Sequence, residues 1–316
     1  MSGSERNRVR LFLWVVPRTT CISTAFTKCL SAIEGMEPPN VRIACSAVRK
    51  QYQLATGEDI PMTYEGNEEK AQQAATIFKP FVGCKIEPSR ILFADVQQKI
   101  ESSDSRYILA KEGGFIFLDD KSRQYIPRGF QHVFLIRDPY KVFTSYKKAI
   151  ISHMTQLGLW NGDAESFNLE KDDAILNPRE FFRETFELWR YVRDNVNPNR
   201  IVLNTDDLLA NPAEVLFKFC HLTGLPFSDS LLQWDASADA TKKWKLSIDR
   251  ALDDRIFFKT ATTDSSGFAP PTPAAPTGHG SSRCQEACRS INAILRGNEQ
   301  VQDVIKIYQE FHLFTV

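Results

Sequence analysis

Several features that would assign this sequence to a special class of protein are absent. The 316 residues include 39 Lys and Arg and 39 Asp and Glu, so the chain carries no formal net charge at pH 7. That balance leaves no surplus of positive charge for broad binding to duplex nucleic acid, although it permits a local basic pocket. The seven cysteines are odd in number and lack the tight spacing of a disulfide framework, which favours reduced thiols inside a cell. We therefore expect no nucleic-acid partner, no disulfide scaffold and a cytoplasmic location.

Long hydrophobic runs are also missing. The first apolar run, over residues 9–16, is too short for the hydrophobic region of a signal peptide with its cleavage site or for a membrane span. Hydrophobic residues still make up 42% of the chain and charged residues 25%, which is typical of a folded globular domain. The sequence therefore predicts one domain over 1–316. Within it, a flexible segment rich in Pro, Gly, Ser and Thr at 262–282 precedes a C-terminal helix.

Short apolar runs and helical patterns alternate along the chain. The runs predict buried strands over 9–16, 107–110, 132–136 and 201–205. Their nearly continuous apolar character is typical of parallel strands covered on both faces. Helical patterns lie between them, one over 24–33 and two that open on Asn-Pro at Asn177 and Asn211 with Glu three residues later, as in a capping box. The second of these should stop near Gly224. The fold class is therefore α/β, a central parallel sheet flanked by helices.

The loop after the first predicted strand has the features of a phosphate site. It leads directly into a helix, whose N-terminal N–H groups and dipole favour an anion. Its length matches a nucleotide P-loop, but it lacks the glycines and the Lys before the last Ser/Thr, so a magnesium-dependent ATP or GTP hydrolase is not favoured. The residues expected to bind phosphate are Arg18, Thr19, Thr20, Cys21, Ile22, Ser23 and Thr24. The alternative is an ordinary helix with a Ser or Thr cap.

A second phosphate site is predicted after the strand over 132–136. Arg137 stands at its carboxyl end, where α/β proteins bind ligands, and Ser145 follows eight residues later in the next helix. A guanidinium fork and a hydroxyl can reach one phosphate together. The alternative is that Arg137 pairs with Asp138 or caps a helix.

Taken together, these segments resemble the sulfotransferase family, whose donor is 3′-phosphoadenosine 5′-phosphosulfate. Residues 18–24 are similar to the family's 5′-phosphosulfate loop, and Arg137 with Ser145 is similar to its 3′-phosphate motif. Residues 202–212 and 222–227 resemble its "YEDLLANP … FLGLPF" segment. The first loop resembles the "PR-S-x-STAL" branch in particular. The resemblance implies a P-loop-containing nucleoside triphosphate hydrolase-like sulfotransferase fold, adenosine 3′,5′-bisphosphate as product, no metal, and a small-molecule acceptor with a hydroxyl or an amine.

The chain departs from the family pattern in three places. The first loop has two more residues between Arg18 and Ser23, so either Arg18 or Thr20 takes the usual Arg/Lys position. The segment that covers the adenosine has no clear counterpart. Many members carry Lys-x-His at the end of a strand as the sulfuryl contact and general base, whereas here Gly113 stands at the His position.

The catalytic roles follow from the resemblance and from these departures. Arg18 would stabilise the leaving phosphate oxygen, Lys111 would contact the sulfuryl oxygens, and Glu112 would take the proton of the acceptor, with His153 as a less favoured base. Glu112 has an ordinary alternative as a surface carboxylate before a Gly-Gly turn.

Two other functions stay open at this point. One is a P-loop kinase or nucleotide hydrolase, which would depend on ATP and Mg²⁺. The other is a catalytically silent protein that binds the nucleotide. No metal site is expected, because Cys284 and Cys288 have no matching Cys or His pair nearby. Besides the acceptor, a second copy of the chain in a homodimer is the only partner we consider.

Overall fold

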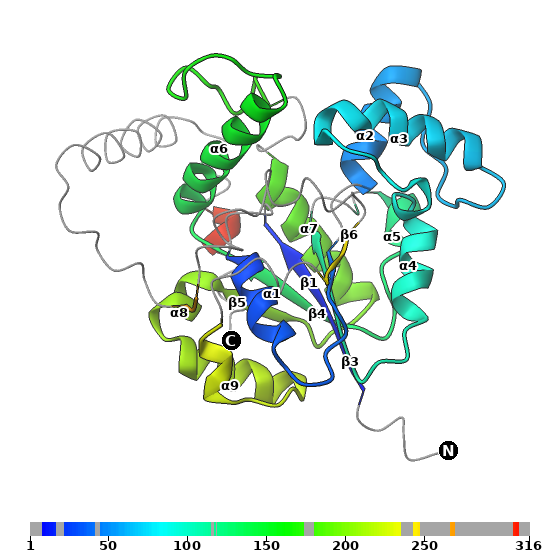
Figure 1. The fold of residues 1–316 in the computed structure, drawn as a ribbon. Helices are drawn as coiled ribbons and strands as arrows, with labels where there is room; N and C mark the ends of the chain where they lie inside the picture. Colours follow the sequence, from blue (N-terminus) through cyan, green and yellow to red (C-terminus); the bar gives the residue numbers. More distant parts are fainter. Residues whose placement is uncertain are drawn as a thin grey trace.

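The computed structural model describes residues 8–16, 22–41, 45–114, 117, 119–173, 180–234, 243–246, 266–268 and 306–309. Within these ranges the chain forms a parallel sheet of six strands in the order β5-β4-β1-β3-β2-β6 (Figure 1). The strands are β1 (Val9–Val15), β2 (Asn40–Val41), β3 (Tyr107–Gly113), β4 (Gln131–Ile136), β5 (Ile201–Asn204) and β6 (Lys245–Leu246). The predicted α/β class with a central parallel sheet is confirmed.

The four predicted strands form the centre and one edge of this sheet, and nearly all of their residues are buried. Their carboxyl ends finish level with one another, because Val15 of β1 lies beside Gly113 of β3 and Leu135 of β4. The loops that follow β1, β3, β4 and β5 therefore open at the same edge of the sheet.

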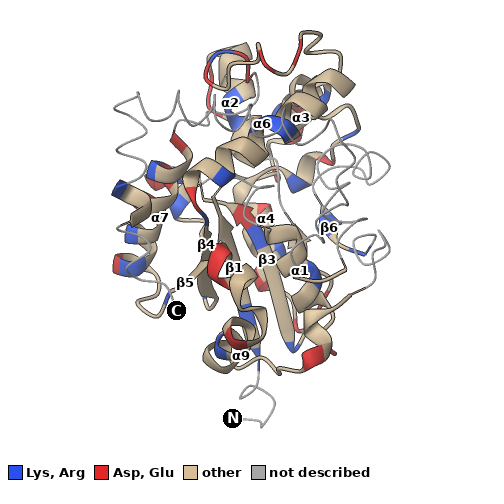
Figure 2. Ribbon diagram, turned by 90° about the vertical axis from the view of Figure 1, so that its left-hand side faces the viewer, with Lys and Arg blue, Asp and Glu red and all other residues tan. Residues whose placement is uncertain are grey.

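Helices cover the sheet and extend beyond its carboxyl edge. They are α1 (Ser23–Ser31), α2 (Cys45–Thr56), α3 (Glu68–Val82), α4 (Phe93–Glu101), α5 (Asp120–Arg123), α6 (Pro139–Gln156), α7 (Phe181–Asn195), α8 (Thr205–Ala210) and α9 (Pro212–Thr223). In Figure 1, α2, α3 and α6 lie on the upper side, beyond the strand ends. The rings of Phe26 and Phe219, 5.1 Å apart, join α1 to α9. Figure 2 shows Lys and Arg mixed with Asp and Glu on helices such as α7 and α9.

The helix ends agree with the sequence in part. Helix α9 stops at Gly224, which adopts φ 74° in the left-handed region. At its start, however, the predicted capping box is wrong: the Asn211 side chain caps no backbone N–H and instead donates to the Glu214 carboxylate. Asn177 lies outside the described residues, as does nearly all of 262–282, so the domain organisation stays a prediction. Among the described helices, none is both long and apolar enough to cross a membrane.

Candidate functional site

The connection from β1 to α1 is described only at its two ends. Arg18, Thr19, Thr20 and Cys21 lie outside the described residues. The chain resumes at Ile22, whose φ of 44° is in the left-handed region that β-branched residues rarely adopt. Such strain persists where the surrounding structure imposes it, which is common in ligand-binding turns.

Ile22 is also the N-cap of α1, and its side chain has no oxygen with which to cap the helix. The alternative of an ordinary Ser or Thr cap is therefore wrong. Ser23 and Thr24 form the first turn instead, and both are buried at the carboxyl edge of β1. The structure thus directs the positive end of the α1 dipole and two hydroxyl-bearing residues toward the edge where ligands bind.

Arg137 follows β4, and its partner is Asp206 in the first turn of α8, which follows the neighbouring strand β5. The Arg137 Nε lies 3.4 Å from Asp206 Oδ1, and Lys141 Nζ lies 3.0 Å from the same oxygen. The backbone N–H of Asp138 donates to the other oxygen of Asp206 at 3.3 Å. The proposed pairing of Arg137 with Asp138 is therefore wrong. Asp138 caps α6 instead, by accepting from the Lys141 N–H at 3.2 Å.

The electrostatics of this cluster keep Asp206 ionised. Partial burial pushes the pKa of Asp206 upward, but the hydrogen bonds from Lys141 and Asp138 and the charges of Lys141 and Arg137 together lower it. The cluster therefore holds two cations around the Asp206 carboxylate, with the Asp138 carboxylate nearby. Burial, together with the nearby Asp206 and Asp138, raises the pKa of Tyr308 to about 12. Asn204 Nδ2 lies 3.4 Å from the Tyr308 hydroxyl, so the C-terminal segment reaches this edge of the sheet. Asp206 lies within the segment 202–212 that resembles a sulfotransferase motif, but the sequence alone assigns it no role.

Ser145 lies in the second turn of α6 and is half-buried. Helix α6 begins two residues after Arg137, so both residues belong to the same strand–helix connection. The rings of Tyr146 and Phe143, which flank this turn, pack against α7.

Lys111 and Glu112 occupy the end of β3, beside Leu13 and Trp14 of β1. Both are buried, with 2% and 4% of their surfaces exposed, so the alternative of a surface carboxylate at Glu112 is wrong. The Glu112 carboxylate accepts from the Gly113 N–H at 3.1 Å. The Lys111 ammonium lies 5.6 Å from the centre of the buried Trp244 ring, which comes from beside β6.

His153 is separated from the other candidate residues. It lies near the far end of α6, about 21 Å along the helix axis from Pro139 at 1.5 Å per residue. It is fully buried, and its Nε2 lies 2.9 Å from the carbonyl oxygen of Phe81 in α3. This contact joins α6 to α3.

A contact that the sequence did not indicate brings α7 to the end of β3. A Cβ added at Gly114 would lie 2.5 Å from the Thr185 Oγ1, which is too close for any side chain there. Thr185 is fully buried in the second turn of α7. The glycine that follows β3 therefore lets α7 approach the carboxyl edge.

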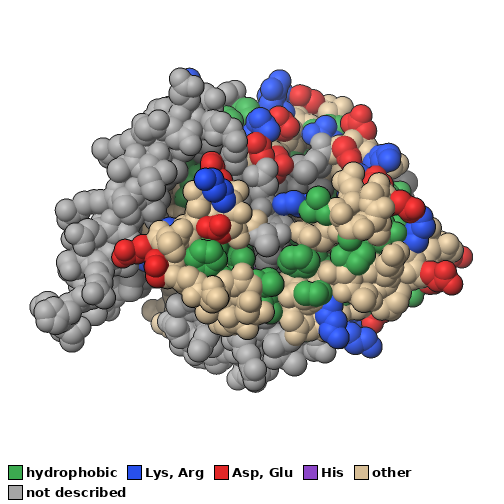
Figure 3. Space-filling model, turned by 90° about the horizontal axis from the view of Figure 1, so that it is seen from above, with side chains coloured by type: hydrophobic (Ala, Val, Ile, Leu, Met, Phe, Trp, Pro, Cys, Tyr) green, Lys and Arg blue, Asp and Glu red, His purple; other side chains and the backbone are tan. Residues whose placement is uncertain are grey.

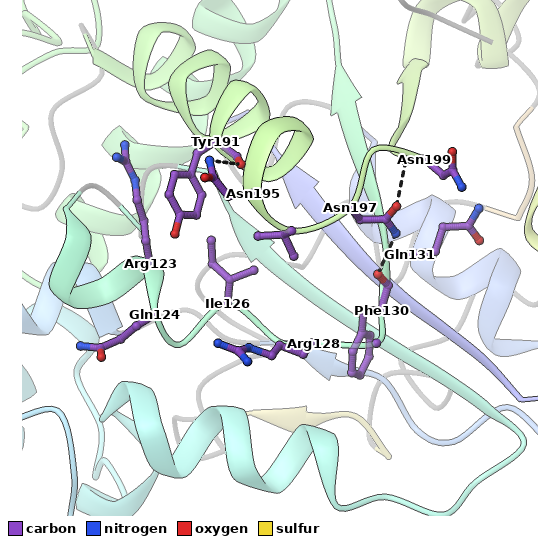
Figure 4. A pocket seen from close by; sticks show the side chains of 12 residues that line it. Arg123, Gln124, Ile126, Arg128, Phe130, Gln131, Tyr191, Asn195, Asn197 and Asn199 are labelled. Carbon is purple, nitrogen blue, oxygen red and sulfur yellow. Dashed lines mark hydrogen bonds between the residues drawn. The ribbon is translucent and has the colours of Figure 1, made fainter.

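A cavity of about 740 Å³ lies at the opposite end of the sheet (Figure 4). It includes Gln131, the first residue of β4, and is walled by the loop after α5 and the end of α7. Two side-chain amides that line it are already hydrogen-bonded to backbone carbonyls of the same wall: Asn197 donates to Phe130 at 3.3 Å and Asn195 to Tyr191 at 3.0 Å. The cavity is therefore separate from the candidate residues at the carboxyl edge. Within the described ranges, no group of three or more His, Cys, Asp or Glu is arranged to hold a metal ion, and Cys284 and Cys288 lie outside them.

Comparisons with known proteins give similarity at the level of structure only. No protein-family model and no curated protein matches the sequence. The sulfotransferase domain from the curacin biosynthetic pathway is similar with a TM-score of 0.40 and 13% identity, covering 91% of this chain and 99% of that one. The sulfotransferase domain of the Synechococcus PCC 7002 olefin synthase gives a TM-score of 0.40 and 15% identity over 91% and 96% of the two chains. What this protein does is therefore inferred from its own residues.

Proposed function

We propose that this protein is a sulfotransferase that moves a sulfuryl group from 3′-phosphoadenosine 5′-phosphosulfate to a hydroxyl or amine of a small molecule. The observation that carries the proposal is the cluster of Arg137, Lys141 and Asp206, which follows β4 and β5 at the same edge of the sheet where β1 ends and leads to α1. Two anion-binding features so placed suit a nucleotide with phosphates at both its 3′ and 5′ positions.

The 3′-phosphate would be bound by Arg137 and Ser145. Arg137 and Lys141 share the Asp206 carboxylate and can offer a phosphate charged hydrogen-bond donors. The Ser145 hydroxyl would add a donor from α6. ATP has no phosphate at its 3′ position and would leave this cluster without a ligand, which is how the protein would prefer the sulfated donor.

The 5′-phosphosulfate would lie at the start of α1. The donor supplies an activated sulfuryl group whose charge spreads over its oxygens in the transition state. The backbone of Ile22, with Ser23 and Thr24, would hold these oxygens, and Arg18 would stabilise the charge on the leaving phosphate oxygen. Lys111 would contact the sulfuryl oxygens from the neighbouring strand end. No step in this scheme requires a metal ion.

The acceptor would approach from the side formed by α2, α3 and α6. Figure 3, which views the molecule from above, shows hydrophobic side chains gathered between charged ones on the surface at this end. Such a surface suits an acceptor with an apolar body and one reactive polar group. The two predicted bases are both buried and have hydrogen-bond partners within the protein: Glu112 accepts from the Gly113 N–H, and His153 contacts the Phe81 carbonyl.

The test is calorimetric titration of the purified protein with adenosine 3′,5′-bisphosphate, compared with ATP plus Mg²⁺. We expect tight binding of the bisphosphate and weak binding of ATP. Preference for ATP with Mg²⁺ would make the chain a kinase or nucleotide hydrolase. Bisphosphate binding without transfer to any acceptor in a broad panel of phenols, alcohols and amines would make it a silent nucleotide-binding protein.

A matched pair of variants on α6 sharpens this test. Ser145→Ala should weaken bisphosphate binding by about 1 kcal/mol, the net contribution of one hydrogen bond. Ser152→Ala removes an exposed hydroxyl from the same helix and should leave binding unchanged. Equal affinities for the two variants would remove Ser145 from the 3′-phosphate site.

A further inference from the structure

A turn near the C-terminus lies beside the end of β5, next to the cluster of Arg137, Lys141 and Asp206. Residues 306–309 form this helical turn, which Figure 1 draws in red between α6 and α8. The side chains of Ile307 and Tyr308 are half-buried and pack against the hydrophobic core. The turn is therefore held in the fold by contacts of its own side chains.

Asn204 connects this turn to Asp206. It is the last residue of β5 and the N-cap of α8, and only 3% of its surface is exposed. Its Oδ1 accepts from the Asp206 N–H at 3.0 Å, and its Nδ2 lies 3.4 Å from the Tyr308 hydroxyl. Because a backbone N–H can only donate, the amide oxygen must face α8 and the amide nitrogen must face Tyr308. One rigid amide thus joins the C-terminal turn to the start of α8.

Asp206 in turn sets the direction of the Arg137 guanidinium. Its Oδ1 lies 3.4 Å from Arg137 Nε, and its other oxygen accepts from the Asp138 N–H at 3.3 Å. A guanidinium binds a phosphate through two N–H groups in one plane, so its orientation decides whether both reach the ligand. Turning the start of α8 would therefore misdirect Arg137.

We propose that Tyr308 is a positioning residue for the 3′-phosphate of the donor: it holds Asn204, and through Asn204 the carboxylate that orients Arg137. The inference rests on the proposed function and adds to it a residue from 104 positions beyond the end of β5. Tyr308 acts through these hydrogen bonds and does not have to touch the nucleotide.

The charge state of Tyr308 suits this role. Burial, and then the nearby Asp206 and Asp138, raise the pKa of the phenol to about 12, while the hydrogen bond from Asn204 opposes part of the rise. The hydroxyl therefore stays neutral near pH 7. It accepts from Asn204 without adding negative charge beside a site for phosphate.

The first test is a double-mutant cycle, read by calorimetry with adenosine 3′,5′-bisphosphate. Tyr308→Phe keeps the ring and removes only the hydroxyl, and Thr205, which donates to the Ile136 carbonyl at 3.1 Å, still ties α8 to β4. We expect about fourfold weaker affinity, within the range for one hydrogen bond. Asn204→Ala also removes the cap of α8 and should weaken binding about tenfold.

The combination of the two substitutions decides whether Tyr308 acts through Asn204. In the Asn204→Ala protein, adding Tyr308→Phe should weaken binding by less than about twofold, because the amide that the hydroxyl holds is already gone. A further fourfold loss would show that Tyr308 acts independently of Asn204, and it would overturn the proposal.

A second nucleotide separates positioning from a general structural role. Adenosine 5′-monophosphate lacks the 3′-phosphate, so its affinity should change by less than about twofold in Tyr308→Phe. Tyr125→Phe removes the hydroxyl of another half-buried tyrosine, whose ring lies 6.5 Å from that of Phe93, and should change neither affinity. Equal losses for both nucleotides in Tyr308→Phe would mean that the hydroxyl only supports the fold.

Transfer kinetics with 2-naphthol as acceptor give an independent readout. Tyr308→Phe should raise the KM for the donor about fourfold and leave kcat within about twofold, because the 3′-phosphate is bound alike before and during transfer. A lower kcat at unchanged KM would contradict the positioning role.

Bisphosphate affinity distinguishes failure of this inference from failure of the proposed function. If the wild-type protein binds adenosine 3′,5′-bisphosphate and Tyr308→Phe binds it equally well, the role of Tyr308 is refuted and the donor site stands. If the wild-type protein itself binds none, the donor assignment has failed and the role of Tyr308 fails with it.

Discussion

Replacing Arg137 by Ala tests the donor site sharply. The structure shows the partner of this side chain, Asp206, and a nucleotide without the 3′-phosphate provides the comparison. Its guanidinium is 19% exposed, and the Asp206 carboxylate, 3.4 Å from its Nε, is 21% exposed. In its degree of burial the pair is thus intermediate between a surface ion pair and a fully buried one. Losing the Arg137 side chain leaves Asp206 with Lys141 and the Asp138 N–H, so the carboxylate stays satisfied. We expect the free energy of unfolding to fall by at most about 1 kcal/mol.

The effect on nucleotide binding should be larger. A hydrogen bond to a charged group contributes about 1.5–3 kcal/mol, and a guanidinium can offer a phosphate two of them. Arg137→Ala also removes one of the two positive charges beside Asp206. Since the site is partly exposed, we take about 3 kcal/mol as the loss. That corresponds to a roughly 100-fold weaker affinity for adenosine 3′,5′-bisphosphate.

The assay is calorimetry with two nucleotides and a matched control. Adenosine 5′-monophosphate lacks the 3′-phosphate, so its affinity should change by less than about threefold in Arg137→Ala. Arg128→Ala removes an exposed arginine at the opposite end of the sheet and should change neither affinity. A similar loss for both nucleotides in Arg137→Ala would refute the assignment of Arg137 to the 3′-phosphate.

Two predictions concern stability. Gly114→Ala should lower the free energy of unfolding by about 1–3 kcal/mol, because its Cβ would lie 2.5 Å from Thr185 Oγ1; an unchanged melting temperature would contradict the close packing of α7 on β3. His132 accepts a hydrogen bond from Trp14 Nε1 at 2.9 Å, and burial lowers its pKa to about 4. In the unfolded chain the His132 imidazole binds a proton near pH 6.5, so the contribution of neutral His132 to stability is complete above that pH. It should be lost as the pH falls toward 4, by about 3 kcal/mol in all. Urea unfolding at pH 7 and pH 4.5 should show a clearly smaller drop for His132→Gln than for the wild-type protein, and an equal drop would exclude His132 as its source.

The sequence predicts the centre of the fold well and its edge poorly, for a physical reason. Strands buried on both faces need apolar residues at nearly every position, so β1, β3, β4 and β5 can be recognised from composition alone. The two-residue strands β2 and β6 contain Asn40 and Lys245 and offer no such run. β2 pairs with the backbone of β3, and β6 in turn pairs with β2, which is a property of the assembled sheet.

The candidate site shows the same limit. From the sequence, the nearest acid to Arg137 is Asp138, yet the structure pairs Arg137 with Asp206. Strands β4 and β5 lie side by side and end together, so residues far apart in the chain meet at the edge. His153 shows the converse, because the length of α6 carries it away from Arg137 although both follow the same strand.

The two glycines after Glu112 mark the place where this chain departs from the Lys-x-His pattern of the family it resembles. A side chain at Gly113 would provide the base from β3 itself, as the resemblance expects. Because Gly114 also lacks one, the strand end is open to α7, and Thr185 fills that space. Enlarging Gly114 would therefore act on more than stability, since pushing Thr185 away also disturbs the end of β3, where Lys111 and Glu112 stand. If these two residues act in the transfer, Gly114→Ala must lower turnover at temperatures where the protein remains folded, while the affinity for the bisphosphate, which depends on α1 and on the Arg137 cluster, stays the same.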